Sequence, residues 1–483
     1  MKFKVLSAVC ALAFAGQAAA LNLATTQAIP ATNTLFISGS SALQNGIGQI
    51  AQSLFVAGTL DVYFNGTAAG VASGNNYRAY SGTVAAGVGI PATLAGQNVV
   101  IYETGAGGSI MGVNPVALRT AVTSLSLTGC VAATAPATTD AITGAPLWSC
   151  PNTVATTVPD AGISDVEPAL FTGINLPAGS TALSAAQLAT LTSTVGIGQV
   201  MGVVVTSNVT AGNPAAVPAV PAKAPALLNL SKAQVAGLMG GTILDWSQVD
   251  SSILPGTTSI VVCRRQGGSG TQAAINASMF GVPCTSAPNF PSTSAATTAI
   301  PGALTAAAPG SIVVVENSSS GALAACMTAA QNGTPAGQAI TLATGAMVPA
   351  GTAGSVVLPA GNYGIGLMGL DRPAKAGELY QFVSINGVAP TLANAVDGKY
   401  DIIVESTFNR PTAMAAGLKL DLYNAFVTKA GDPVVLGNPL HTVAGVAALS
   451  ENAWVAPAAF TATNPVLKVG NFGNTCKPLQ QLQ

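Results

Sequence analysis

The chain has 483 residues and a formal net charge of −1, and only 7% of its residues are charged, against roughly 25% in a typical globular protein. Apolar residues make up 49%, which excludes a typical disordered chain. The sequence contains no run of Lys and Arg, which argues against nucleic acid as a partner because binding to the phosphate backbone needs grouped cations.

The N-terminus has the pattern of a secretory signal peptide. Lys2 and Lys4 precede an apolar stretch at 5–15, and three alanines end at Ala20. We therefore expect a signal peptide at 1–20, cleaved after Ala20, and a periplasmic or extracellular mature protein. No later segment is an uninterrupted apolar run of about 18 residues, so we expect no membrane span in the mature chain.

Strand-like and helix-like patterns alternate along the rest of the chain, which predicts an α/β architecture with mainly parallel sheets. At about 100–200 residues per domain, two or three domains are expected. The strand candidates lie at 35–37, 98–102, 198–206, 259–263, 312–315, 363–368 and 400–404, and the helix candidates at 43–54, 231–239, 271–280, 321–331 and 412–427.

Two stretches have the composition of insertions. Residues 114–160 are rich in Thr, Ala and Pro, and residues 210–228 contain repeated Ala-Val-Pro and Ala-Pro units, which indicate an extended surface loop.

Six cysteines follow the predicted signal peptide, and an even number in an exported chain predicts disulfides. From local spacing we expect Cys130–Cys150 within the first insertion and Cys263–Cys284, which leaves Cys326–Cys476. A metal site is the weaker interpretation, because no pair has C-x-x-C spacing and the only histidine, His441, has no cysteine nearby.

The segment from Ile260 to Thr271 has the pattern of an anion site. A strand ends in Arg264 and Arg265, and a glycine turn with Ser269, Gly270 and Thr271 leads into a helix. A helix N-terminus offers free N–H groups, glycines let the backbone approach a ligand, and arginine adds a fork of donors. The alternative is an ordinary glycine turn with a Ser cap. Two adjacent arginines among only 16 Lys and Arg favour the anion site.

Three further strand-to-loop transitions carry polar residues. Ile37 to Ala42 passes through Gly and hydroxyl residues into a helix, a glycine-rich loop ends at Ser109, and Asp165 follows the short apolar segment at Ile163. Each alone is equally compatible with a turn or a helix cap.

In this order, the motifs resemble the periplasmic phosphate-binding proteins of phosphate ABC transporters. That family has a Gly-hydroxyl loop, a Gly/Ser loop, a Ser-Asp step, a Leu-rich segment ending in Trp, and then Arg-x-x-Gly-Ser-Gly-Thr. Residues 230–246 fit the Leu-rich segment and residues 265–271 fit the last motif. The resemblance covers most of the mature chain, and its specific part is the Arg-to-Thr segment.

The resemblance implies a type II periplasmic-binding-protein fold, with lobe 1 at 21–205 plus 405–483, lobe 2 at 206–404, and the ligand in a cleft between the lobes. It implies a monomer that binds phosphate or a similar oxyanion, an ABC permease as partner and no cofactor. Gly267 departs from the family, which typically has an Asp there. The implied phosphate contacts are Ser41, Ala42 through its backbone N–H, Asp165, Arg265, Ser269, Gly270 and Thr271, with Ser109 as a further candidate.

Two alternatives remain open. The low charge, the insertions and the altered site residues are compatible with an extracellular or surface-matrix protein that keeps the fold without delivery to a transporter. An enzyme is less favoured, because a Ser-His-Asp hydrolase would need His441, and the chain contains neither a G-x-S-x-G elbow nor a P-loop with its Lys.

Overall fold

The structure is a computed structural model that describes residues 20–40, 43–70, 75–209, 229–250, 260–285, 312–333, 340–341, 355–356, 361–438, 441, 444–450 and 464–481. Ser41, Ala42, the loop at 210–228 and all but the last residue of the predicted signal peptide lie outside these ranges.

Strands that are far apart in the sequence join into one large sheet of 15 strands within the described part of the chain. The order along its main path is β13-β12-β16-β10-β19-β9-β1-β4-β3-β2-β7-β6, while β17, β20 and β21 pair off it. Its strands are β1 (Thr34–Gly39), β2 (Asp61–Asn65), β3 (Tyr77–Thr83), β4 (Asn98–Thr104), β6 (Val131–Ala132), β7 (Leu147–Cys150), β9 (Ala161–Ser164), β10 (Leu191–Thr206), β12 (Ile260–Arg265), β13 (Ile312–Asn317), β16 (Tyr363–Gly369), β17 (Tyr380–Phe382), β19 (Ile403–Pro411), β20 (Val446–Leu449) and β21 (Val466–Leu467).

Helices and short strand pairs complete the fold. The helices are α1 (Leu23–Gln27), α2 (Gln44–Leu54), α3 (Asn114–Leu118), α4 (Ala185–Leu188), α5 (Lys232–Gly240), α6 (Gly270–Phe280), α7 (Ser320–Asn332), α8 (Leu392–Val396), α9 (Leu418–Ala430) and α10 (Pro433–Leu436). The short pairs are β5 (Val122–Leu125) with β8 (Thr153–Thr157), β11 (Asn229–Leu230) with β18 (Ser384–Ile385), β14 (Ile340–Thr341) with β15 (Ser355–Val356), and β22 (Val469–Gly470) with β23 (Gln480–Gln481).

The predicted α/β class is confirmed, but the prediction of mainly parallel sheets is wrong, because the large sheet is mixed. β1 runs parallel to β4 and β9, and β12 runs parallel to β13 and β16. β10 is antiparallel to both β16 and β19, and β3 is antiparallel to β2 and β4. Two elements are also displaced from prediction. The strand expected at 400–404 is β19, and the helix expected at 412–427 begins at Leu418, since Gly417 has φ +143° and cannot be helical.

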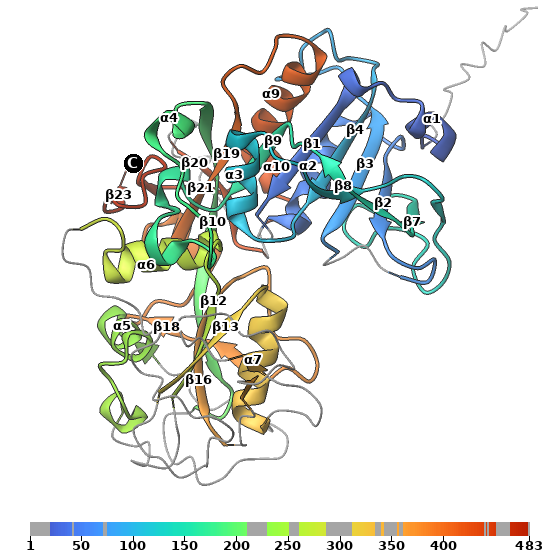
Figure 1. Cartoon of the computed structure of the whole chain (residues 1–483). Coiled ribbons are helices and arrows are strands. Elements are labelled where there is room, and N and C mark those ends of the chain that lie inside the picture. Colours follow the sequence, from blue (N-terminus) through green and yellow to red (C-terminus); the bar gives the residue numbers. More distant parts are fainter. Residues whose placement is uncertain are drawn as a thin grey trace, which may run out of the picture.

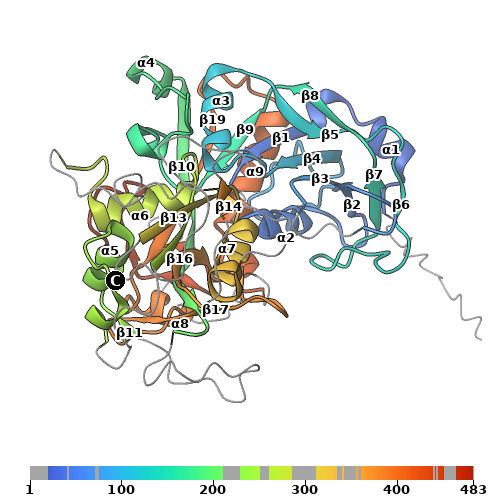
Figure 2. The same cartoon turned by 60° about the horizontal axis from the view of Figure 1, so that its bottom comes forward.

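Two α/β lobes are joined through the long strands β10 and β19, which run from one lobe to the other (Figure 1). One hydrophobic cluster packs α2 and α9 against β1 and β4, with Ile47 and Phe426 fully buried at its centre. The largest cluster packs α5 and α6 against β12 and β16 and extends along β10. The second view shows α6 lying beside β10 (Figure 2), so the helix that follows the two arginines lies where the lobes meet. The lobe boundaries at 205/206 and 404/405 stay a proposal.

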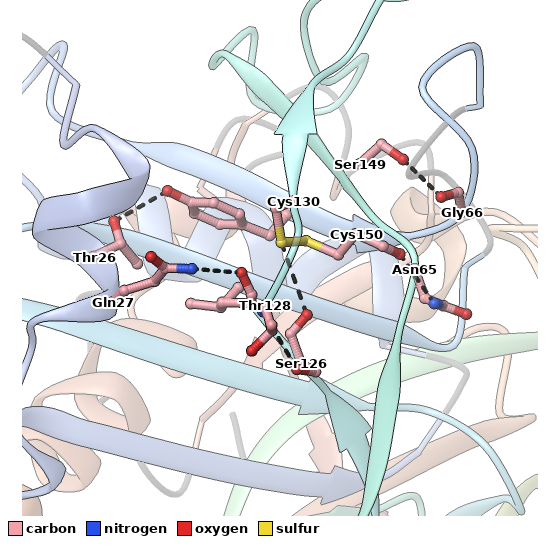
Figure 3. Close-up of a disulfide and its surroundings, with 11 residues drawn as sticks. Thr26, Gln27, Asn65, Gly66, Ser126, Thr128, Cys130, Ser149 and Cys150 are labelled. Carbon is pink, nitrogen blue, oxygen red and sulfur yellow. Dashed lines mark hydrogen bonds between the residues drawn. A yellow bond between two sulfur atoms is a disulfide. The ribbon is translucent and has the colours of Figure 1, made fainter.

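The stretch at 114–160 is built into lobe 1. β7 pairs in parallel with β2 and extends the main sheet, and β5 pairs with β8 above β4. The Cys130–Cys150 disulfide closes this region, and Gln27, the last residue of α1, donates a hydrogen bond to the Leu127 carbonyl at its edge (Figure 3).

All six cysteines that follow the predicted signal peptide form disulfides, but only the Cys130–Cys150 pairing was predicted correctly. Cys263 pairs with Cys326, which joins β12 to α7, and Cys284 pairs with Cys476 across 192 positions. The predicted Cys263–Cys284 and Cys326–Cys476 pairs are therefore wrong. Cys263 is a buried residue in the middle of β12, and α7 packs on that strand, so its side chain meets α7 and not the turn that follows α6.

Candidate functional site

The polar loops recognised in the sequence meet at one edge of the sheet. β1 is parallel to both β4 and β9, so the residues that follow these strands leave the sheet at the same edge. Ser40, Ser109 and Asp165 lie there, and all are buried. The turn between β12 and α6 reaches them from the other lobe, and the Ile110 N–H donates to the Gly268 carbonyl over 3.0 Å.

Asp165 is the centre of this cluster. Its Oδ1 accepts a hydrogen bond from the Ser40 hydroxyl, and its Oδ2 accepts one of 3.0 Å from the Thr271 hydroxyl. Its backbone N–H donates to Oγ of Ser109 over 3.4 Å. Only 2% of Asp165 is exposed, so both lobes supply hydroxyl donors to one buried carboxylate.

The N-terminus of α6 faces the same point. Ser269 caps the helix by accepting a hydrogen bond from the Gln272 N–H, so the preceding turn is fixed. The first N–H groups of an α-helix have no acceptor within the helix and carry the positive end of its dipole. Gly270 is required for the close approach, because a Cβ there would lie 2.6 Å from Oγ of Ser109 and 2.8 Å from Cβ of Asp165.

The two arginines point to different partners. Arg264 forms an ion pair of 2.8 Å with Glu316 on the neighbouring strand β13. Arg265 donates to Oγ of Ser320 and to the Ser318 carbonyl over 3.2 and 3.1 Å. Burial lowers the pKa of Arg265, and the nearby carboxylate of Asp165 opposes that shift.

One donor of Arg265 is unused. Its Nε is buried and has no hydrogen-bond partner in the part of the chain that the structure describes, while the residue as a whole is only 4% exposed. A buried N–H without an acceptor is unfavourable, and an oxyanion at this point would supply one.

Gly267, where the resembling family carries an acid, lies against lobe 1. A Cβ at Gly267 would lie 2.1 Å from the Leu176 carbonyl oxygen, so no aspartate fits here without moving the loops apart. The neighbouring Gly268 N–H donates to the Asn175 carbonyl over 2.8 Å. The contact between the two lobes thus leaves no room for an acid at position 267.

Asp371 is a second acid near Arg265 that the sequence analysis missed. It follows β16 and accepts a hydrogen bond of 3.3 Å from the Gln199 side chain in β10. Burial and the charge of Asp165 raise its pKa to about 7, and Arg372 and Arg265 lower it less. The signal available was an acid directly after a strand candidate, in a chain with only 17 Asp and Glu.

The structure brings together five of the predicted contact residues, Asp165, Arg265, Ser269, Gly270 and Thr271, and it adds Ser109. Ser41 and Ala42 lie outside the described residues, and it is Ser40 that reaches Asp165. Ser318 and Ser320 were missed as partners of Arg265, although three consecutive serines before a helix pattern were visible.

His441 lies against α2, where its Cε1 would be 3.0 Å from a Cβ at Gly46. Burial lowers its pKa to about 4, so the ring is neutral near pH 7. Within the described ranges, no group of three or more His, Cys, Asp or Glu side chains is arranged to hold a metal ion. Likewise, no helix in these ranges is long and apolar enough to cross a membrane.

No protein-family model matches this chain, and no match is found among curated proteins. Several solved structures match this chain at low similarity. A putative phosphate ABC transporter substrate-binding protein with bound phosphate from Clostridium perfringens is 11% identical with a TM-score of 0.38, over 85% of this chain and 95% of that one.

Two further structures of this kind match. An ABC-type phosphate transport receptor from Vibrio cholerae is 14% identical with a TM-score of 0.29, over 56% of this chain and 74% of that one. A possible phosphate-binding protein from Planctomyces limnophilus is 9% identical with a TM-score of 0.32, over 82% of this chain and 87% of that one. At these scores the likeness carries no conclusion about the ligand of this chain.

Proposed function

We propose that this chain is an exported solute-binding protein that captures phosphate or a similar small oxyanion where its two lobes meet, and that it is not an enzyme. The observation that carries the proposal is the buried carboxylate of Asp165, which accepts hydrogen bonds from Ser40 of one lobe and Thr271 of the other. Delivery to an ABC permease is the role that the order of the sequence motifs suggests.

The chemistry around Asp165 favours an anion that still carries a proton. An ionised carboxylate only accepts hydrogen bonds, so it repels a fully ionised ligand. Phosphate near neutral pH keeps at least one O–H that donates to Asp165, while its other oxygens accept from Arg265 and from the N–H groups at the start of α6. Sulfate has no proton to donate and would leave the carboxylate facing a like charge.

Isothermal titration calorimetry on the mature chain, residues 21–483, tests this proposal at fixed ionic strength with phosphate, arsenate and sulfate. We expect one site for phosphate and arsenate, and far weaker binding of sulfate. Sulfate binding as tight as phosphate binding, or no binding of any of the three, would contradict it.

A further inference from the structure

A cavity of about 400 Å³ lies in lobe 1, at the opposite edge of the sheet from the oxyanion site. Its lining includes Thr34 at the start of β1 and Asp160 just before β9, whereas Asp165 follows β9. At a rise of about 3.3 Å per residue, the two acids are roughly 16 Å apart along the strand. The volume is in the range of about 300–1,000 Å³ that small-molecule sites occupy.

The floor of this cavity is aromatic. Phe36 of β1 and Tyr102 of β4 are direct neighbours in the parallel ladder, so their side chains leave the same face of the sheet. The roof comes from the β5–β8 pair, where Leu125 and Val154 add aliphatic surface, and from Leu127, which follows β5. A flat ring between these two surfaces would contact apolar groups on both faces.

The two charged residues that line the cavity, Asp160 and Lys419, contact each other. Lys419 of α9 donates a hydrogen bond of 2.8 Å to Oδ1 of Asp160, and Oδ2 of Asp160 accepts from the Phe36 N–H over 3.0 Å. Both oxygens of Asp160 therefore have partners. Lys419 uses only one of its three N–H groups in these contacts.

Tyr102 adds a second unused donor. Its hydroxyl has no hydrogen-bond partner among the described residues, and burial raises its pKa to about 12, so it keeps its proton. The unused polar groups that we identify are thus donors, and a ligand must present an acceptor to them. Asp160 already pairs with Lys419, so a second negative charge beside them would be repelled. One anionic group is therefore the most that this part of the cavity accommodates.

We propose that this cavity binds a small amphipathic molecule, with a flat apolar body between Phe36 and the β5–β8 pair and one anionic acceptor group at Lys419. This cavity is separate from the oxyanion site. Experiments can therefore refute the proposal of phosphate binding or that of amphiphile binding without affecting the other.

Two fluorescent probes that differ by a single group test the proposal on the mature full-length protein. 8-Anilinonaphthalene-1-sulfonate has an apolar body and one sulfonate, and N-phenyl-1-naphthylamine is the same body without the sulfonate. We expect saturable one-site binding of both, with the sulfonate probe binding more tightly. Absence of saturable binding of either probe would overturn the proposal.

A substitution that fills the cavity distinguishes probe binding in this cavity from probe binding to other apolar surfaces. Val154 lines the cavity and is 40% exposed, so Val154→Trp fills the opening without overpacking the core. Val131 is 52% exposed in β6 and does not line the cavity, which makes Val131→Trp the matched control. We expect Val154→Trp to weaken both probes by roughly tenfold or more and Val131→Trp to leave them unchanged. Equal binding to both variants would place the probes elsewhere and refute the site.

Substitution of Lys419 tests the proposed contact with the anionic group of the ligand. Lys419→Met keeps the length of the side chain and removes its donors, so we expect the sulfonate probe to weaken by roughly tenfold while the neutral probe is unaffected. An equal loss for both probes would refute the role of Lys419. Phosphate calorimetry on the same variants should match the wild type.

Discussion

The Thr271 hydroxyl at the start of α6 donates a hydrogen bond of 3.0 Å to Oδ2 of Asp165, 106 residues earlier in the chain. This contact joins the two lobes through a buried carboxylate at the N-terminus of α6. We therefore expect both the closure of the site and its choice of anion to depend on Asp165.

Asp165→Asn should narrow the preference for phosphate over sulfate. An amide keeps one acceptor for Ser40 or Thr271 and gains a donor, so it no longer repels an anion that has no proton. Phosphate loses the acceptor for its O–H and should bind more weakly, while sulfate should bind more tightly. Competition calorimetry at fixed ionic strength measures the ratio. If the substitution changes only the free energy of unfolding and leaves the ratio unchanged, Asp165 is a structural residue and not a selective one.

Arg265→Ala should weaken phosphate binding by roughly tenfold or more, because a charge-assisted hydrogen bond contributes about 1.5–3 kcal/mol. Arg264 is the matched control, since it lies next in sequence and pairs with Glu316. Arg264→Ala should lower the stability of β12 and β13 and change the phosphate affinity much less. Titration of both variants, together with urea unfolding, separates the two effects. Equal losses of affinity would contradict the assignment.

Much of the site could be predicted from the sequence because it follows from local rules. Alternation along a strand assigned Arg264 and Arg265 to opposite sides, and the structure gives them different partners. The turn from Gly267 to Thr271 joins a strand to a helix, and the residue that caps the helix, Ser269, lies within the turn. The sequence of this short segment was therefore enough to predict its local structure.

Features that depend on packing across the chain could not be predicted in the same way. The partner of Cys284 is 192 positions away, and nothing in the local spacing distinguishes Cys476 from Cys326. Asp371 approaches the site only because β16 lies between β12 and β10 in the sheet. Ser40 donates a hydrogen bond to Asp165, and its place beside other serines in the sequence gave no local sign of this contact.

Asp61→Asn should change how stability depends on pH. Asp61 is 1% exposed, and its Oδ2 has no partner among the described residues. Burial raises its pKa from 3.8 to about 6, and the hydrogen bond from Trp148 opposes this shift. Between these values the folded state holds the proton and the unfolded state has lost it, so the contribution of Asp61 to stability falls as the pH rises from about 4 to 6.

The asparagine should therefore gain more stability at pH 8 than at pH 4, by roughly 2–3 kcal/mol, since the shift is about two pKa units and each unit corresponds to about 1.4 kcal/mol. Urea unfolding at both pH values measures this difference. Asp397 is the opposite control, because its exposed carboxylate pairs with Lys399 and Lys468, which lower its pKa. Asp397→Asn should lose stability at both pH values, because these ion pairs weaken only as the pH falls below 3.8, and a gain at pH 8 relative to pH 4 as large as that of Asp61→Asn would contradict the prediction.

The Cys284–Cys476 disulfide should be the first of the three to open under mild reduction. Cys476 is exposed and Cys284 is partly exposed, whereas the cysteines of the other two bridges are buried. Thiol–disulfide exchange requires access of the attacking thiolate to a sulfur, so the accessible bridge reacts fastest. Differential alkylation and peptide mapping after graded reduction measure the order. Earlier opening of Cys130–Cys150 or Cys263–Cys326 would contradict it.

Opening this bridge should also weaken the oxyanion site, because it releases the C-terminal end of α6. The segment before Cys476 is held by the carboxylate of Glu167, which accepts hydrogen bonds of 2.9 and 2.6 Å from the N–H and hydroxyl of Thr475, and Glu167 is two residues from Asp165. The bridge therefore ties the loop that follows α6 to the strand end that carries Asp165. We expect Cys284→Ser/Cys476→Ser to weaken phosphate binding, whereas Cys130→Ser/Cys150→Ser should lower stability by about 2–4 kcal/mol and leave the affinity unchanged. Calorimetry on both double variants decides the matter, since equal affinities would mean that α6 is held by its packing alone.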